Sequence, residues 1–162
     1  MPVWQPILLG ALFKRFDRDS WARGPGREEG MREVERRASA YALPAVRWPD
    51  PWPGNTLTAM RAATFAKETG RAVAFSLAAF RQAFAGGRDL SEVDYVLMAA
   101  AACELHPKAV LKGIESRNVK DALRAATDEA AERGVVGVPS VAVGDEVFWG
   151  DDRLDDAAAA AG

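Results

Sequence analysis

The chain has 162 residues, a mass of 17.4 kDa and a formal charge of −2 at pH 7. This length suits one domain with a sizeable core, and no apolar run approaches the roughly 20 residues that a membrane-spanning helix needs. The lack of a basic excess disfavours nucleic-acid binding, and the first residues do not resemble a secretory signal. We therefore expect a cytoplasmic protein without a membrane or nucleic-acid partner.

One cysteine and one histidine narrow the possible chemistry. The single Cys103 excludes an internal disulfide, a dithiol redox pair and a zinc site built from cysteines, and the single His106 excludes a histidine-rich metal site. Cys103 lies in an apolar segment and is expected to be an inert buried thiol. His106 precedes Pro107 and is expected to be a helix cap or a surface residue. We expect no metal site.

Charge is unevenly distributed along the chain. Residues 14–37 carry eight Lys and Arg against six Asp and Glu, whereas residues 145–156 carry six acids against one Arg. The basic run is interpreted most simply as the solvated face of a helix.

The first third of the chain contains one predicted strand, one predicted helix and a stiff connection. β-Branched and aromatic residues over 3–9 predict a short strand. Over 27–41, apolar side chains recur at helical spacing with charges between them, which predicts a helix packed on one face only. Prolines then predict an extended connection without regular structure: Pro44, Pro49, Pro51 and Pro53.

The middle of the chain is predicted to be helical. Asn55 or Thr56 is positioned to cap the first of these helices, a capping box from Ser91 to Asp94 to open the third, and Asn118 to cap the last. Glycines and one proline separate the helices. The predicted helices cover residues 57–70, 71–84, 93–103, 107–116 and 118–133.

The last residues change character. Residues 138–143 predict a strand, Gly144 and Asp145 suit a type II′ turn, and residues 146–149 predict a second strand that returns antiparallel to the first. From residue 150 onward, acids followed by alanines predict a final helix, because the helix dipole favours acids in the first turn.

Residues 134–154, GVVGVPSVAVGDEVFWGDDRL, resemble the corresponding stretch of 2-hydroxychromene-2-carboxylate isomerases, kappa-class glutathione transferases and DsbA-like proteins. Residues 6–14, PILLGALFK, are similar to the strand and loop after the family's first helix, and residues 55–57 to the start of its helical insertion. The resemblance implies an α/β, thioredoxin-like (DsbA-like) fold in a single domain over 1–162. Its sheet part with the terminal helix would comprise residues 1–14 and 134–162, and about 27–133 would form a large all-helical insertion with the connecting helices.

The resemblance also implies a glutathione site on the hairpin. In the family the bond before this proline is cis and the backbone there pairs with the cysteinyl part of glutathione, a role that falls to Val138 and Pro139. Trp149 stands where the family keeps an aromatic side chain close to the site. The ordinary alternatives are a proline that ends a strand ladder and a tryptophan in the core.

The acidic end of the implied site receives the γ-glutamyl group of glutathione. The positions that match the family's acidic pair are Asp151 and Asp152, whose carboxylates suit an ammonium group beside helix N–H groups. Asn55 is expected to reach toward the site that Trp149 borders. The ordinary interpretation of two aspartates at this position is helix capping.

The sequence departs from the family pattern at its amino end. The family's reaction needs a serine at the N-terminus of its first helix, which holds glutathione as a thiolate, and that serine lies ahead of the stretch matched to residues 3–9. We therefore expect the N-terminal strand–helix unit to be missing here and leave the catalytic residue unknown. The family's Asn-x-Pro-Pro-like loop is also not visible in residues 15–26, which removes contacts to glutathione.

The missing strand would leave a gap, because the family's first strand lies in the middle of its sheet. The natural protein begins upstream, or residues 3–9 move inward to pair with residues 140–143, or an open edge pairs with another copy. For the chain as given, we expect self-association into a homo-oligomer, most simply a dimer.

The function that the resemblance implies is glutathione-dependent isomerisation like that of 2-hydroxychromene-2-carboxylate isomerase. The glutathione thiol would add to an unsaturated acid derived from aromatic degradation, permit rotation about the former double bond, and leave again as a cofactor. The alternative is a non-catalytic fragment or binding module of the same family. DsbA-like redox chemistry is implied only as shared ancestry, because the chain has no dithiol.

Overall fold

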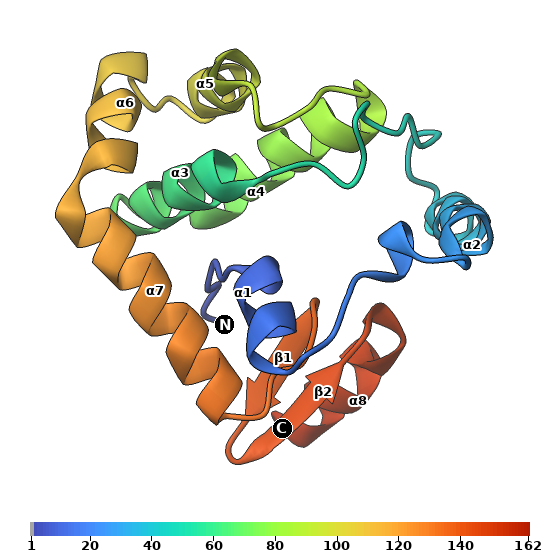
Figure 1. Cartoon of the computed structure of the whole chain (residues 1–162). Helices are drawn as coiled ribbons and strands as arrows, with labels where there is room; N and C mark the ends of the chain where they lie inside the picture. Colours follow the sequence, from blue (N-terminus) through green and yellow to red (C-terminus); the bar gives the residue numbers. More distant parts are fainter. Residues whose placement is uncertain (1) are drawn as a thin grey trace.

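The computed structural model describes residues 2–162, and Met1, with which the predicted domain begins, lies outside them. The helical elements in chain order are α1 (Leu9–Arg15), η1 (Trp21–Arg23), α2 (Arg27–Ala40), α3 (Leu57–Glu68), α4 (Ala72–Phe80), η2 (Arg81–Ala85), α5 (Val93–Ala102), α6 (Pro107–Glu115), α7 (Arg117–Glu132), η3 (Asp151–Arg153) and α8 (Leu154–Ala160). Helices α3–α6 form a helical layer, and α7 runs from it to a smaller part that contains a β-hairpin (Figure 1). Across the described part of the chain, no helix is both long enough and apolar enough to cross a membrane.

The helical layer is packed mainly by alanine. Nine alanines from α3, α4, η2 and α5 are buried there, together with larger side chains such as Phe75, Val96 and Val110, which are at most 1% exposed. Small side chains let the helices approach closely, so the interior is dense although few of its residues are large.

Side chains cap α6 and α7. His106 Nδ1 accepts a hydrogen bond from the Lys108 N–H at 3.2 Å, which confirms the predicted cap. At the start of α7, Ser116 Oγ accepts from the Val119 N–H at 3.3 Å, so the cap is Ser116 and the prediction of Asn118 is wrong. Both residues are good caps, and the choice depends on where α6 ends.

The predicted caps of α3 and α5 differ in outcome. Asn55 Oδ1 accepts from the Leu57 N–H at 3.0 Å, as expected at the start of α3. The Ser91 hydroxyl instead donates to Asp89 at 2.5 Å, and the Ser91 N–H donates to the other oxygen of the same carboxylate at 2.9 Å. The predicted capping box from Ser91 to Asp94 therefore does not form, and α5 begins without a side-chain cap.

The predicted strand over residues 3–9 is wrong: residues 3–8 are unpaired and α1 follows directly. Pro6 has no N–H to give to a strand ladder, and the Leu8 N–H donates to Thr127 Oγ1 of α7 at 3.0 Å. Leu12 of α1 is 1% exposed and packs in a second core with residues of α7 and the hairpin. Helix α1 therefore packs between α7 and the hairpin.

The hairpin comprises β1 (Ser140–Val143) and β2 (Glu146–Trp149), antiparallel, with Ser140 opposite Trp149. Gly144 has φ +57°, as the first turn position of a type II′ hairpin requires. Helix α8 covers the hairpin, where Phe148 is 5% exposed. Within residues 2–162, β1 pairs with β2 alone, so residues 3–9 do not move inward to pair with it. Self-association stays a prediction.

None of the residues of α2 is buried. Aromatic side chains of η1 and of the proline-rich connection join this helix to the helical layer. The ring centroids of Trp48 and Trp52 are 4.3 Å apart, and those of Trp21 and Trp52 are 5.4 Å apart. Trp48 also meets Phe84 of η2 edge-on at 5.9 Å. Arg27 lies over the Trp52 ring and donates to its carbonyl at 2.9 Å. The proline-rich connection thus fixes α2 at the side of the helical layer.

Candidate functional site

A short turn between α7 and β1 holds the predicted cysteinyl-binding residues. The Val138–Pro139 bond is cis, as the resemblance implied, and the Val138 side chain is 46% exposed. Ser140 Oγ donates to the Gly137 carbonyl at 2.7 Å, and the Gly150 N–H donates to the Pro139 carbonyl at 3.0 Å. These bonds hold the turn against the end of β2.

Trp149 lies against this turn with its indole 47% exposed. A Cβ atom added at Gly137 would lie 2.5 Å from Trp149 Nε1, so only glycine lets the ring approach this closely. The Arg18 guanidinium lies 5.3 Å from the Trp149 ring centroid, and Arg18 Nη1 donates to the Val136 carbonyl at 3.4 Å. The alternative of a core tryptophan is therefore wrong, because the indole forms part of the surface.

Asp151, in the short helix η3 that follows the hairpin, forms an ion pair with α2. Its Oδ1 accepts from Arg37 Nη1 at 2.6 Å, and the Tyr41 hydroxyl lies 3.5 Å from its Oδ2. Arg37 Nε also donates to Glu33 at 2.8 Å. The basic run and the acidic run of the sequence thus meet here. The side chains of Asp151 and Arg37 remain 36% and 39% exposed.

Asp152 and Asn55 are placed differently from Asp151. The exposed Asp152 side chain folds back over Gly150, and no hydrogen bond or ion pair is recorded for it within residues 2–162. Asn55 Oδ1 accepts from the Leu57 N–H at the start of α3. The geometry therefore brings together Val138, Trp149 and Asp151, and the place of Asn55 in the site stays a prediction.

The family model of the DSBA-like thioredoxin domain matches residues 20–161. The chain belongs to this family. It is 30% identical over 125 residues to a 2-hydroxychromene-2-carboxylate isomerase of Sphingobium xenophagum, in an alignment that covers 77% of the chain and 63% of that protein. The chain therefore spans less than two thirds of that relative's length.

A solved structure of selenomethionine 2-hydroxychromene-2-carboxylate isomerase has the same fold, with a TM-score of 0.86 and 20% sequence identity. The superposition covers 98% of this chain and 78% of that one. The predicted resemblance and the DsbA-like thioredoxin fold, rich in helix with a small sheet, are thus confirmed.

In this DsbA-like chain, Arg18 and Arg37 are contacts that sequence reasoning missed. Both come from the basic run that was interpreted as a solvated helix face, and Arg37 is 114 residues from its partner along the chain. The signal that could have pointed to the pair was the opposite charge imbalance of residues 14–37 and 145–156.

The ion pairs of Glu33 with Arg36 and Arg37 predict how stability depends on pH. Hydrogen bonds from Arg36 and then Arg37 lower the pKa of Glu33 from its ordinary 4.5 to about 2, and bonds to Glu33 and the charge of Asp151 raise the pKa of Arg37. Because the pKa of Glu33 is depressed in the folded state, its contribution to stability is fully present above pH 4.5 and is lost as the pH falls toward 2.

We expect thermal midpoints measured from pH 7 to pH 2 to show wild type above Glu33→Gln at neutral pH, with the difference shrinking below pH 4.5 and in high salt. Glu29→Gln is the control, since Glu29 lies on the same helix and makes no recorded ion pair in the described chain. A Glu33→Gln difference that is unchanged at pH 2 would contradict the assignment.

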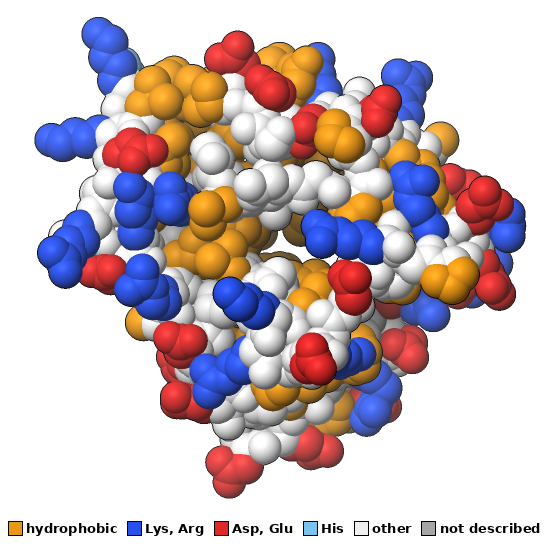
Figure 2. Space-filling view, in the orientation of Figure 1, with side chains coloured by type: hydrophobic (Ala, Val, Ile, Leu, Met, Phe, Trp, Pro, Cys, Tyr) orange, Lys and Arg blue, Asp and Glu red, His pale blue; other side chains and the backbone are white. Residues whose placement is uncertain are grey.

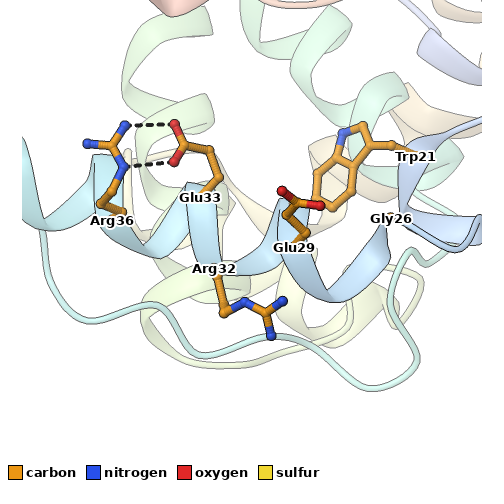
Figure 3. Close-up of a pocket in the computed structure, with 7 residues that line it drawn as sticks. Trp21, Gly26, Glu29, Arg32, Glu33 and Arg36 are labelled. Carbon is orange, nitrogen blue, oxygen red and sulfur yellow. Dashed lines mark hydrogen bonds and ion pairs between the residues drawn. The ribbon is translucent and has the colours of Figure 1, made fainter.

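Two grooves lie elsewhere on the surface. One, of about 520 Å³, runs along α2 between Trp21 and Arg36, where Glu33 and Arg36 pair (Figure 3). The other, of about 270 Å³, lies between Phe65 and Asn118. Neither groove includes a residue of the predicted glutathione site.

Figure 2 shows a further opening at the centre of the face, with hydrophobic and basic side chains around it. Among residues 2–162, no group of three or more His, Cys, Asp or Glu could hold a metal ion.

Proposed function

We propose that the chain binds glutathione on the hairpin and acts as a glutathione-dependent isomerase of the kind its curated relative is named for. The observation that carries the proposal is the grouping of Val138, Trp149 and Asp151, all partly exposed, at one end of the hairpin. These are the positions that the resemblance of residues 134–154 implies for a tripeptide site.

Each part of glutathione has a proposed partner there. The cysteinyl backbone pairs with the N–H and C=O of Val138 as an added strand would, and the γ-glutamyl ammonium lies between Asp151 and Asp152. Trp149 supplies an apolar surface beside the thiol. Asn55, whose side-chain oxygen accepts from the Leu57 N–H, is a further proposed contact.

The proposed reaction is a reversible addition to an unsaturated acid derived from an aromatic compound. The glutathione sulfur forms a C–S bond at one end of a conjugated C=C bond, and the electron pair moves toward the carbonyl oxygen. Rotation about the resulting single bond follows. Expulsion of the thiolate re-forms the double bond, so glutathione is unchanged at the end. The residue that activates the thiol is left unassigned.

A second candidate is a binding module that holds glutathione without turnover. It is favoured by the unpaired edge of β1 within the described residues, a place where an extended peptide can add as a strand. Isomerisation of an unsaturated aromatic-derived acid, followed by absorbance with and without glutathione, separates the two: binding without glutathione-dependent turnover supports the module.

Glutathione binding itself is tested by thermal shift. At a concentration about ten times its Kd, glutathione should stabilise the fold by about 1.4 kcal/mol, which raises the Tm of a chain of this size by about 3–6 °C. Asp152→Ala should abolish the shift, because it removes a carboxylate with no recorded partner at the proposed γ-glutamyl end.

Asp155→Ala is the matched control for this experiment, since Asp155 is an exposed acid in the first turn of α8. It should leave the glutathione shift intact. A shift that persists in Asp152→Ala, or that is lost equally in both variants, would contradict the γ-glutamyl assignment, and no shift in wild type at millimolar glutathione would contradict the proposed function.

A further inference from the structure

Arg18 extends from the end of α1 onto the hairpin side of the molecule. Asp17 follows the helix with φ +50°, a left-handed conformation common at helix ends, and the Arg18 N–H donates to the Phe13 carbonyl at 2.9 Å. Leu12 of the same helix is buried in the second core. The backbone that carries the Arg18 side chain is therefore fixed by the end of a packed helix.

The Arg18 side chain lies against the turn that precedes β1 and against Trp149. Its guanidinium carbon is 5.3 Å from the Trp149 ring centroid, and Nη1 donates to the Val136 carbonyl at 3.4 Å. Gly137 lets the indole lie on this turn, because a Cβ there would be 2.5 Å from Nε1. Two segments far apart in the sequence thus hold a guanidinium and a partly exposed indole together.

No carboxylate of residues 2–162 is recorded as a partner of the Arg18 guanidinium, although acids are close in the chain. The acids on either side of Arg18 in sequence are exposed, and one of them accepts from a backbone N–H of its own loop at 2.7 Å. Of the two aspartates that follow the hairpin, Asp151 pairs with Arg37 at 2.6 Å and Asp152 folds back over Gly150. Because a guanidinium stays charged, Arg18 can take a carboxylate from a ligand.

An exposed indole with a guanidinium against it suits a flat, conjugated carboxylate. A planar ligand stacks on the free part of the indole, and its carboxylate matches the planar set of arginine donors. A bulky, non-planar acid would lose the stacking contact, and a flat neutral molecule would lose the ionic one. The pair therefore selects for both properties at once.

We propose that Arg18 and Trp149 form the subsite for the unsaturated acid, with the carboxylate on Arg18 and the conjugated chain along the indole. This inference rests on the proposed function for the identity of the acid as a substrate. The backbone proposed to hold the cysteinyl group, at Val138, is one residue from Gly137, so the acid lies beside the thiol. Arg18 then determines specificity, since it distinguishes acids from their neutral analogues.

The test is isothermal titration calorimetry with trans-cinnamate as the flat carboxylate, cinnamamide as its neutral analogue and cyclohexanecarboxylate as a non-planar acid. Wild type should bind cinnamate more tightly than the other two. Arg18→Met should weaken cinnamate about tenfold, the effect of losing a charge-assisted hydrogen bond, and leave cinnamamide unchanged. Arg18→Lys should recover part of the loss. Arg15→Met is the control, because Arg15 lies at the end of the same helix and pairs with Asp128 at 3.5 Å.

Three results with these probes would overturn the inference. Equal weakening of cinnamate and cinnamamide in Arg18→Met would mean that Arg18 only holds the indole in place. Equal weakening of cinnamate in Arg18→Met and Arg15→Met would mean that only the general positive charge of this end of α1 matters. The third result is a wild-type protein that does not bind cinnamate at millimolar concentration, either alone or with glutathione.

A second titration, with glutathione and its glycine amide, identifies the source of the carboxylate. If Arg18→Met weakens glutathione but neither the amide nor cinnamate, Arg18 binds the glycyl carboxylate, which overturns this inference and leaves the proposed function. If cinnamate binds in an Arg18-dependent way and wild type does not bind glutathione, the acid subsite stands and the proposed function fails.

Discussion

Replacing Phe75 with alanine is expected to lower the free energy of unfolding by about 3–5 kcal/mol. The Phe75 ring is 1% exposed at the centre of the helical layer, where most of its buried neighbours are alanines. Alanines cannot extend into the space that the ring leaves, so the substitution creates a cavity as well as removing apolar contacts. The loss is a large fraction of a typical domain stability of 5–15 kcal/mol, and urea denaturation measures it.

Phe80→Ala is the matched control for this prediction, because Phe80 lies on the same helix with its ring 59% exposed. The same change of side chain there should alter stability by less than about 1 kcal/mol. If Phe80→Ala destabilises the protein as much as Phe75→Ala, the outer face of α4 is covered in solution and the core assignment is wrong.

The parts of the fold that sequence reasoning predicted are those set by local pattern. The hairpin follows from two short β-rich runs with Gly144 and Asp145 between them, and the helices over 57–68 and 117–132 follow from apolar periodicity with good caps nearby. The β-rich run over 3–9 misled, because a strand also needs a partner. Here the Leu8 N–H meets Thr127, a contact 119 residues away in sequence that no local pattern reveals.

The residues of the candidate site also differ in whether they lie close together or far apart in the sequence. Val138, Trp149 and Asp151 lie within 14 residues of one another, and the hairpin register brings them together, so the resemblance could place them as a group. Asn55 was assigned to the site across a long stretch of chain; it bonds the start of α3, and its part in the site stays a prediction. Arg18 and Arg37 reach the hairpin only because the aromatic cluster of the proline-rich connection fixes where α2 lies.

Gly137→Ala is expected to displace the Trp149 indole and to weaken glutathione binding. A Cβ at this position would lie 2.5 Å from Nε1 and 2.7 Å from Cε2 of the ring, closer than carbon contacts allow. The ring must move away from the Val138 turn, which removes the apolar surface proposed for the thiol and costs about 1–3 kcal/mol of stability. Near-UV circular dichroism measures the displacement of the indole, and urea denaturation measures the loss of stability. The thermal shift with glutathione measures the loss of binding.

A double-mutant cycle shows whether Trp149 is the cause of that effect. In a Trp149→Ala background the added methyl group has room, so Gly137→Ala should cost at least about 1 kcal/mol less than it does in wild type. Gly24→Ala is the glycine control, since its added Cβ would lie 3.7 Å from the nearest atom, the Trp21 carbonyl oxygen. Strictly additive costs at Gly137 and Trp149 would mean that the ring does not depend on this glycine, and glutathione affinity unchanged in Gly137→Ala would remove Trp149 from the proposed site.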